Sequence, residues 1–178
     1  QIYSKEKAMS LVVVTGLGPR TGTSFVMNQA RLKGLPIKGQ AFIDGLTIPQ
    51  HNPDGYWEST SNDLTDVITS SKRSIIKLWY PVLQQLNADI ISCIVVLERR
   101  NKLAQMHSIY KTFKSECALT PSLYSILETV EDFHTHYDGL NSLVNKLNKT
   151  KVMRVYTEDL NESISDVLCF LERGLTWL

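Results

Sequence analysis

The chain has 178 residues, of which 43% are hydrophobic and 21% are charged. This length and composition suit one domain that buries its own core, and we expect a single domain over residues 1–178. The formal net charge of +1 excludes the broad basic surface that non-specific nucleic-acid binding needs, so any anion site must be local.

The cysteines and the apolar runs narrow the class of protein further. Cys93, Cys117 and Cys169 are odd in number and lack metal-ligand spacing, so we expect no metal site and a reducing compartment. No apolar run approaches the roughly 20 residues that span a bilayer, and the first ten residues lack the apolar stretch of a signal peptide. We therefore expect a cytoplasmic protein that binds neither membrane nor nucleic acid.

Hydrophobic periodicity predicts the elements of the first half. Residues 11–15 form an apolar run bounded by glycine, which is typical of a strand buried on both faces of a parallel sheet. Residues 35–58 contain three prolines and no sustained period, so we expect a long loop of the kind that usually has a function. The other elements expected in this half are helices over 22–34, 61–71 and 81–86 and a strand over 74–80.

The second half continues the alternation. Residues 89–99 are the most strand-like segment, and a helix is expected over 100–113. The remaining elements expected are a helix over 120–148, a strand with its exit over 151–160 and a helix over 163–173. This order predicts an α/β fold with a mostly parallel central sheet flanked by helices on both faces, whose ligands bind at the carboxyl ends of the strands.

The segment VTGLGPRTGTS, residues 14–24, follows the first strand and opens a helix. Such a glycine-rich turn can direct backbone N–H groups and the helix dipole at one anion. A nucleotide triphosphatase loop has lysine after its second glycine, whereas Thr23 follows Gly22 here and the cation is Arg20. A phosphate cradle without the usual lysine is predicted, and a tight turn without a ligand is the alternative.

The run from Pro19 to Ser24, PRTGTS, resembles the loop of the sulfotransferase family, which binds 3′-phosphoadenosine 5′-phosphosulfate (PAPS). The resemblance implies a P-loop-like three-layer α/β/α fold and no metal. It also implies that the 5′-phosphosulfate group is held by the following residues: Arg20, Thr21, Gly22, Thr23 and Ser24. The stretch between Gly16 and Arg20 is one residue longer than is usual in that family.

Two further segments resemble the same family in the same order. Arg100 is followed eight positions later by Ser108, and the resemblance implies that this pair binds the 3′-phosphate of PAPS. Arg99 is the rival, but His107 occupies the matching position, and a solvated helix start remains the alternative. The third segment, YTEDL at residues 156–160, is similar to the family pattern YEDL with one residue interposed.

Three residues are expected to be catalytic. Arg20 would stabilise charge on the transferring group and the leaving phosphate, and the resemblance implies the other two. Lys77, on the strand after the long loop, would stabilise the transferring sulfuryl group, unless it points outward from a sheet edge. Gln40 stands where some relatives have a glutamate base, whereas the segment NPDGYWE at residues 52–58 is similar to one in bacterial and phage-type members. Glu58 is therefore the preferred base and His51 the next choice, while a helix-capping role for Glu58 remains open.

The sequence thus predicts a PAPS-dependent sulfotransferase that acts on a hydroxyl or amine of an unknown small-molecule, carbohydrate or peptide acceptor. Two alternatives remain. A nucleoside or nucleotide kinase would need a magnesium carboxylate, for which Glu98, Glu158 and Asp159 are the candidates at strand ends. A non-catalytic nucleotide-binding relative would keep the donor site and lack the base.

Overall fold

The computed structural model of the chain describes residues 11–41, 53–69, 73–83, 86–116, 128, 132, 138–148 and 151–177. Its centre is a five-stranded sheet in the order β2-β3-β1-β4-β5, in which all neighbouring strands pair in parallel. The strands are β1 (Leu11–Gly16), β2 (Ile37–Lys38), β3 (Ile75–Lys77), β4 (Ile91–Glu98) and β5 (Val152–Tyr156). The mostly parallel sheet predicted from the sequence is confirmed.

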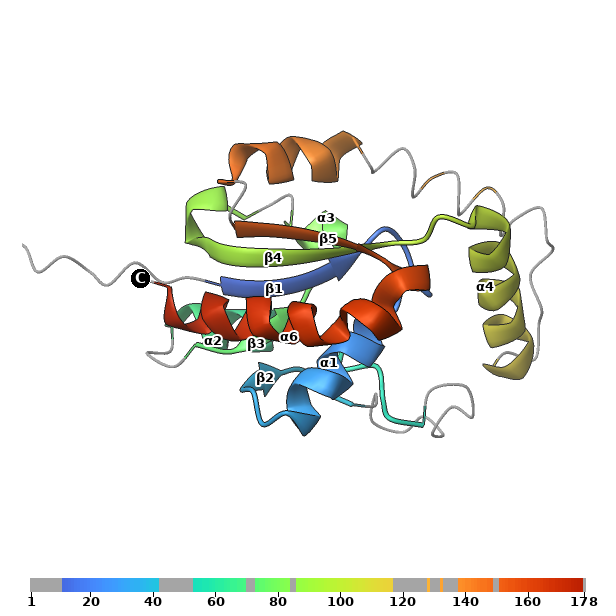
Figure 1. The fold of residues 1–178 in the computed structure, drawn as a ribbon, viewed down its shortest axis with the longest axis horizontal. Helices are drawn as coiled ribbons and strands as arrows, with labels where there is room; N and C mark the ends of the chain where they lie inside the picture. Colours follow the sequence, from blue (N-terminus) through green and yellow to red (C-terminus); the bar gives the residue numbers. More distant parts are fainter. Residues whose placement is uncertain are drawn as a thin grey trace, which may run out of the picture.

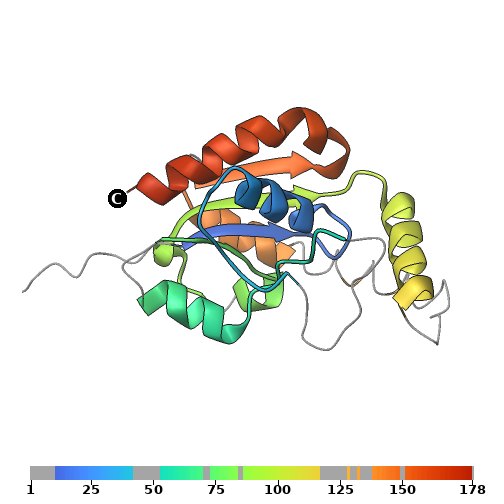
Figure 2. The same cartoon turned by 90° about the horizontal axis from the view of Figure 1, so that it is seen from below.

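Helices cover both faces of this sheet (Figures 1 and 2). On one face lie α1 (Thr23–Leu32) and α6 (Leu160–Thr176), and on the other lie α2 (Ser61–Thr69), α3 (Tyr80–Leu83) and the helical residues 138–146. The helix α4 (Lys102–Glu116) lies beyond the carboxyl end of β4. Two short 3-10 helices, η1 (Ala88–Ile90) and η3 (Thr157–Asp159), precede β4 and follow β5.

The alternation of side chains along β1 produces two separate cores. Leu11 and Val13 pack into the cluster beneath α2 and the helix at 138–146, whereas Val12 and Val14 pack beneath α1 and α6. All six residues of β1 are buried, as expected for a central parallel strand covered on both faces. The helix–sheet–helix layers therefore follow from the apolar pattern of the strands. The polar loops connect these layers at the ends of the strands.

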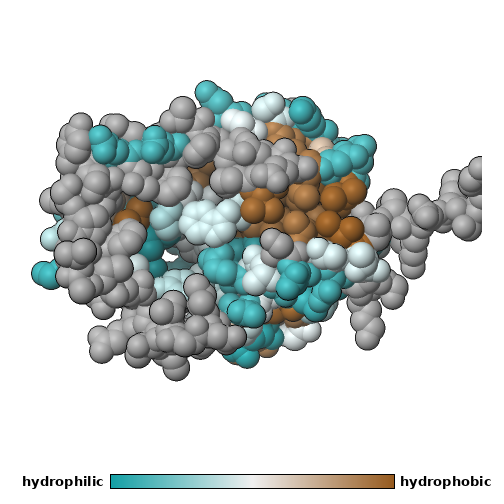
Figure 3. Space-filling model, turned by 180° about the vertical axis from the view of Figure 1, so that it is seen from behind, coloured by the Kyte–Doolittle hydropathy of each residue, from teal (hydrophilic) through white to brown (hydrophobic). Residues whose placement is uncertain are grey.

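On the face that carries α2 and α3, hydrophobic residues form a broad patch beside hydrophilic ones (Figure 3). Partly buried residues of the first core, among them Leu64, Ile68 and Leu86, lie on this side of the sheet. Within the described ranges, no helix is both long enough and apolar enough to cross a bilayer.

Several element boundaries differ from the sequence expectations, and three of these differences are larger than a shift of an element end by a few residues or concern the site. The prediction of an unbroken loop over 35–58 is wrong at Ile37–Lys38, where a two-residue edge strand pairs with β3. A strand of two residues is too short to show a hydrophobic period in the sequence. The strand expected over 74–80 pairs only as far as Lys77. The last helix is longer than 163–173 because η3 leads directly into it at Leu160. Most of the helix expected over 120–148 lies outside the described residues.

Candidate anion-binding and transfer site

The turn between β1 and α1 uses left-handed backbone at alternate residues. Gly18, Arg20 and Gly22 have φ angles of 83°, 65° and 93°. For Arg20 this conformation is uncommon, since a side chain disfavours it. At Gly22 an added Cβ would also lie 2.8 Å from Cδ2 of Leu160, so any larger residue there strains the backbone and displaces the Leu160 side chain.

Side chains from distant elements hold the carbonyl groups of this turn. Gln105, buried in α4, donates its amide to the carbonyl oxygens of Leu17 at 3.0 Å and Pro19 at 2.9 Å. Arg99 donates to the carbonyl of Arg20 at 3.3 Å. In the same way, the hydroxyl of Thr157 donates to the carbonyl of Thr21 at 2.7 Å. These bonds fix the path of the loop without using its amide N–H groups.

The first turn of α1 follows the loop directly. The first N–H groups of a helix have no partner within the helix, and Gly22, at the cap position, has no side chain to bind them. Such a helix start favours an anion through both its N–H groups and its dipole. The hydroxyl residues Thr23 and Ser24 lie in this turn, and Arg20 adds a positive charge two residues before Gly22.

Ser108 lies beside the loop arginine. The Nε atom of Arg20 donates a hydrogen bond to Ser108 Oγ at 3.0 Å, although the two residues are 88 positions apart. The structure therefore brings Ser108 to the predicted donor loop. The described hydrogen bonds and ion pairs do not join Ser108 to Arg100, so their shared role at one phosphate stays a prediction.

Arg100 is held instead by residues that follow β5. Its guanidinium donates two bonds to the carboxylate of Asp159, at 2.8 and 2.6 Å, and lies 4.1 Å from the ring centre of Tyr156. The backbone N–H groups of Arg100 and Asn101 donate to Glu158 at 3.2 and 3.1 Å. Partial burial would raise the pKa of the Glu158 carboxyl, but these N–H bonds outweigh it and hold that pKa below its ordinary value.

Lys77, the last residue of β3, is buried in the site and does not point outward from a sheet edge. Its side chain is only 6% exposed. The ammonium donates to Ser24 Oγ at 3.2 Å, to the carbonyl of Tyr56 at 2.8 Å and to the carboxylate of Glu58. Burial lowers the pKa of Lys77 below its ordinary value, and the Glu58 carboxylate opposes that shift.

Glu58 receives donors on both carboxylate oxygens. Oε1 accepts from Lys77, and Oε2 accepts from the indole N–H of Trp79 at 3.0 Å. An antiparallel bridge between Gln40 and Glu58 fixes the backbone of this segment. The side chain of Glu58 keeps 30% of its exposure, so water or a ligand can still reach it.

The structure thus gathers most of the predicted residues at the carboxyl ends of β1 and β3. It adds three that the sequence reasoning missed: Gln105, Thr157 and Trp79. Gln105 lies three positions before Ser108 on the same helix face, Thr157 is the residue interposed in YTEDL, and Trp79 is two residues after Lys77. His51, the second choice of base, lies outside the described residues.

Carboxylates at the strand ends are already paired. Glu98 accepts from Arg154 at 2.5 Å, and Asp159 accepts from Arg100. Clusters of three or more His, Cys, Asp or Glu able to hold a metal ion are absent from the part of the chain that the structure describes. The kinase alternative would require these carboxylates to exchange their cations for magnesium.

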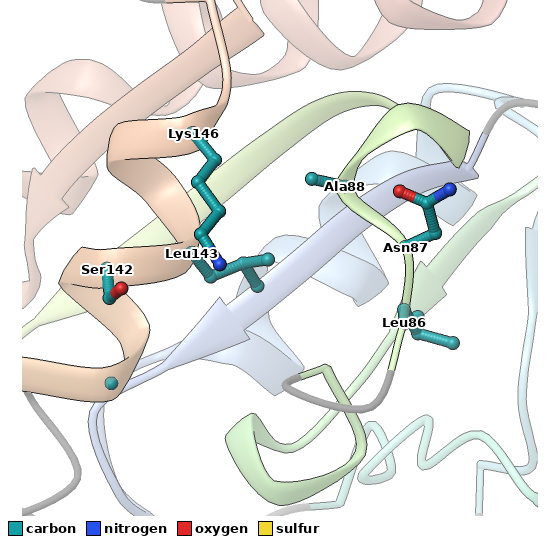
Figure 4. Close-up of a pocket in the computed structure, with 7 residues that line it drawn as sticks. Leu86, Asn87, Ala88, Ser142, Leu143 and Lys146 are labelled. Atoms are coloured by element: carbon teal, nitrogen blue, oxygen red, sulfur yellow. The ribbon is translucent and has the colours of Figure 1, made fainter.

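A hollow of about 320 Å³ lies at the other end of the sheet. It is bounded by residues 86–88, which precede β4, and by the helix at 138–146 (Figure 4). Leu86, Asn87, Leu143 and Lys146 line it. Because it adjoins the amino end of β4, it is separate from the site built around Arg20 and Lys77.

Comparison with known proteins supports the fold. No family model and no curated protein matches the chain. Among solved structures, the chain is similar to mouse sulfotransferase SULT7A1 complexed with PAP, with a TM-score of 0.53 and 14% identity, over 94% of this chain. The match spans 62% of the length of that protein. The chain therefore has a sulfotransferase-like α/β fold with its polar site at the carboxyl ends of the strands.

Proposed function

We propose that this chain binds PAPS and transfers its sulfuryl group to the hydroxyl or amine of an acceptor. One observation carries the proposal: the buried ammonium of Lys77 lies against Ser24 in the first turn of α1, directly after the Arg20 loop. A fixed cation at an anion-binding helix start suits the stabilisation of charge that develops during group transfer. The solved sulfotransferase with a similar fold was complexed with PAP, 3′-phosphoadenosine 5′-phosphate.

The donor would occupy the loop and helix start. Arg20 and the N–H and hydroxyl groups of Thr23 and Ser24 would hold the 5′-phosphosulfate. Ser108, hydrogen-bonded to Arg20, would lie near the 3′-phosphate together with Arg100. Side chains that already hold the loop carbonyls make this arrangement rigid, which lowers the ordering cost of binding.

Glu58 would take the proton from the acceptor. As the acceptor oxygen or nitrogen forms its bond to sulfur, the bond between sulfur and the 5′-phosphate oxygen breaks, and PAP leaves. Lys77 would stabilise the charge on the transferring group and the leaving oxygen. Lys77 and Trp79, through their hydrogen bonds to Glu58, would also hold its carboxylate in a fixed orientation toward the acceptor. We propose a small-molecule, carbohydrate or peptide acceptor.

Calorimetry tests the donor site first. Purified protein is titrated with PAP without magnesium, and in parallel with ATP plus magnesium. Micromolar binding of PAP and much weaker binding of ATP are expected, and Arg20→Ala is expected to abolish most of the PAP signal. Preference for ATP would favour a kinase, and absence of binding to both would refute the proposal.

A second measurement tests turnover. PAP release from PAPS is followed in the presence of a panel of phenols, amines, sugars and tyrosine peptides. Release that depends on an acceptor is expected. PAP binding without release on any acceptor would instead favour a non-catalytic nucleotide-binding protein.

A further inference from the structure

Two of the chain's own carboxylates bind the two residues that directly precede α4. Glu158 accepts the backbone N–H groups of Arg100 and Asn101, and Asp159 accepts both terminal nitrogens of the Arg100 guanidinium. A phosphate at a helix start uses the same kinds of donor, namely backbone N–H groups and a bidentate arginine. Anion positions beside α4 are therefore filled by the protein itself.

The Arg100–Asp159 pair is well formed but open to water. Its two bonds are short, and the ring of Tyr156 lies beneath the guanidinium at 4.1 Å. The side chains of Arg100 and Asp159 are nevertheless 52% and 42% exposed. An ion pair in such surroundings has a small net stability, so a dianionic phosphate can displace the carboxylate.

We propose that Asp159 determines how strongly the donor site selects a nucleotide with a 3′-phosphate, because it competes with that phosphate for Arg100. This inference rests on the proposed function. When the 3′-phosphate binds the same two terminal nitrogens of Arg100, it displaces Asp159, whereas a nucleotide without this phosphate leaves the pair intact. Asp159 therefore weakens the affinity for PAP and leaves the affinity for adenosine 5′-monophosphate (AMP) unchanged.

Asp159 can be changed without loss of a helix cap. It precedes α6 as the cap residue, but its side chain makes no capping hydrogen bond. Asp159→Asn keeps the shape of the side chain and removes its charge. Glu162, an exposed acid in the first turn of the same helix, gives the matched control, since Glu162→Gln removes one negative charge away from the ion pair with Arg100.

The experiment measures the dissociation constants of PAP and AMP, which differ only in the 3′-phosphate. Wild type, Asp159→Asn, Glu162→Gln, Arg100→Ala and the double variant Asp159→Asn/Arg100→Ala are titrated by calorimetry. Asp159→Asn is expected to tighten PAP binding about five- to tenfold, from the lost competition and the lost repulsion. AMP binding should change less than about twofold. In the Arg100→Ala background, where there is no competition for Arg100, Asp159→Asn should tighten PAP binding much less than it does in the wild-type background.

Several results would overturn the inference. Unchanged or weaker PAP binding by Asp159→Asn would mean that Asp159 does not compete with the 3′-phosphate for Arg100. Equal tightening by Glu162→Gln would mean that the effect comes from the net charge of the protein and not from the Arg100–Asp159 pair. If wild type binds PAP and only the Asp159→Asn response fails, the proposed function stands and this inference falls. If neither wild type nor Asp159→Asn binds PAP, both are refuted.

Discussion

The ammonium of Lys77 lies 3.2 Å from the hydroxyl oxygen of Ser24, so the end of β3 and the first turn of α1 meet in one site. The first residue sits on a strand buried on both faces, and the second is 53 positions away in sequence. A buried cation in this place must have partners, because an isolated buried charge is costly. Those partners, Ser24, Tyr56 and Glu58, surround the position proposed for the transferring group.

The substitution Lys77→Met should abolish most of the sulfuryl-transfer activity and leave nucleotide binding nearly unchanged. We expect the rate of PAP release from PAPS to fall by about 10²–10³, the usual loss when one donor to developing charge is deleted. PAP affinity should stay within about threefold, since the loop and Arg20 remain. The matched control is Lys38→Met on the neighbouring strand, where the lysine pairs with Asp66 at the surface; its rate should equal that of wild type. Unchanged turnover in Lys77→Met would contradict the assigned role.

The substitution Ser108→Ala should weaken the binding of PAP more than the binding of AMP. A hydrogen bond to a charged phosphate contributes about 1.5–3 kcal/mol, which corresponds to at least tenfold in the dissociation constant of PAP. The neighbouring exposed residue supplies the control, and His107→Ala should leave both affinities unchanged. If calorimetry finds equal losses for PAP and AMP, Ser108 acts only by holding Arg20, with which it shares a 3.0 Å bond.

Gly22→Ala should destabilise the fold more than Gly34→Ala. Both glycines have positive φ, 93° and 83°, so each substitution carries backbone strain of about 1–2 kcal/mol. At Gly34 an added Cβ meets nothing within 4 Å, whereas at Gly22 it lies 2.8 Å from Leu160. Overpacking against Leu160 adds about 1–3 kcal/mol to the destabilisation caused by Gly22→Ala.

Urea unfolding of the two glycine variants measures this difference in stability. Titration of the same samples with PAP shows whether the loop between β1 and α1 still binds the nucleotide. Gly22→Ala should lose PAP affinity and Gly34→Ala should not. Equal unfolding free energies for the two variants would mean that the Leu160 side chain makes room for the added Cβ without cost.

The Glu158 carboxylate should make a small, pH-dependent contribution to stability. Its folded pKa is below the ordinary value, so the unfolded chain binds more protons in the acid range. The contribution is present above the unfolded pKa of about 4.3 and is lost as pH falls through the folded pKa. Because the group is exposed, we expect less than about 1 kcal/mol.

Urea unfolding of wild type and Glu158→Gln at pH 7, 5 and 3 tests this contribution. The difference between the two proteins should be similar at pH 7 and 5 and shrink at pH 3. A difference that grows as the pH falls would contradict the assigned bonds from Arg100 and Asn101.

The apolar pattern alone determined the layers of this protein. The runs at 11–15 and 89–99 are continuous and flanked by helical periods, so they predict central parallel strands, and β1 and β4 lie there. Local chemistry also determined the turn, since glycine at 18 and 22 supplies the left-handed backbone that a tight strand-to-helix connection uses. These features depend on residues close together in the chain, which a sequence displays directly.

Only the tertiary structure decided which charges meet. The family resemblance predicts that Arg100 and Ser108 bind one phosphate, which stays a prediction. What the sequence could not show is that the fold pairs Arg100 with Asp159 and Ser108 with Arg20. These partners are 59 and 88 positions apart, and Lys77 is 19 positions from Glu58. Ion pairs and hydrogen bonds depend on distances of a few ångströms between side chains, and such distances are fixed only when parallel strands bring their carboxyl ends to one edge of the sheet.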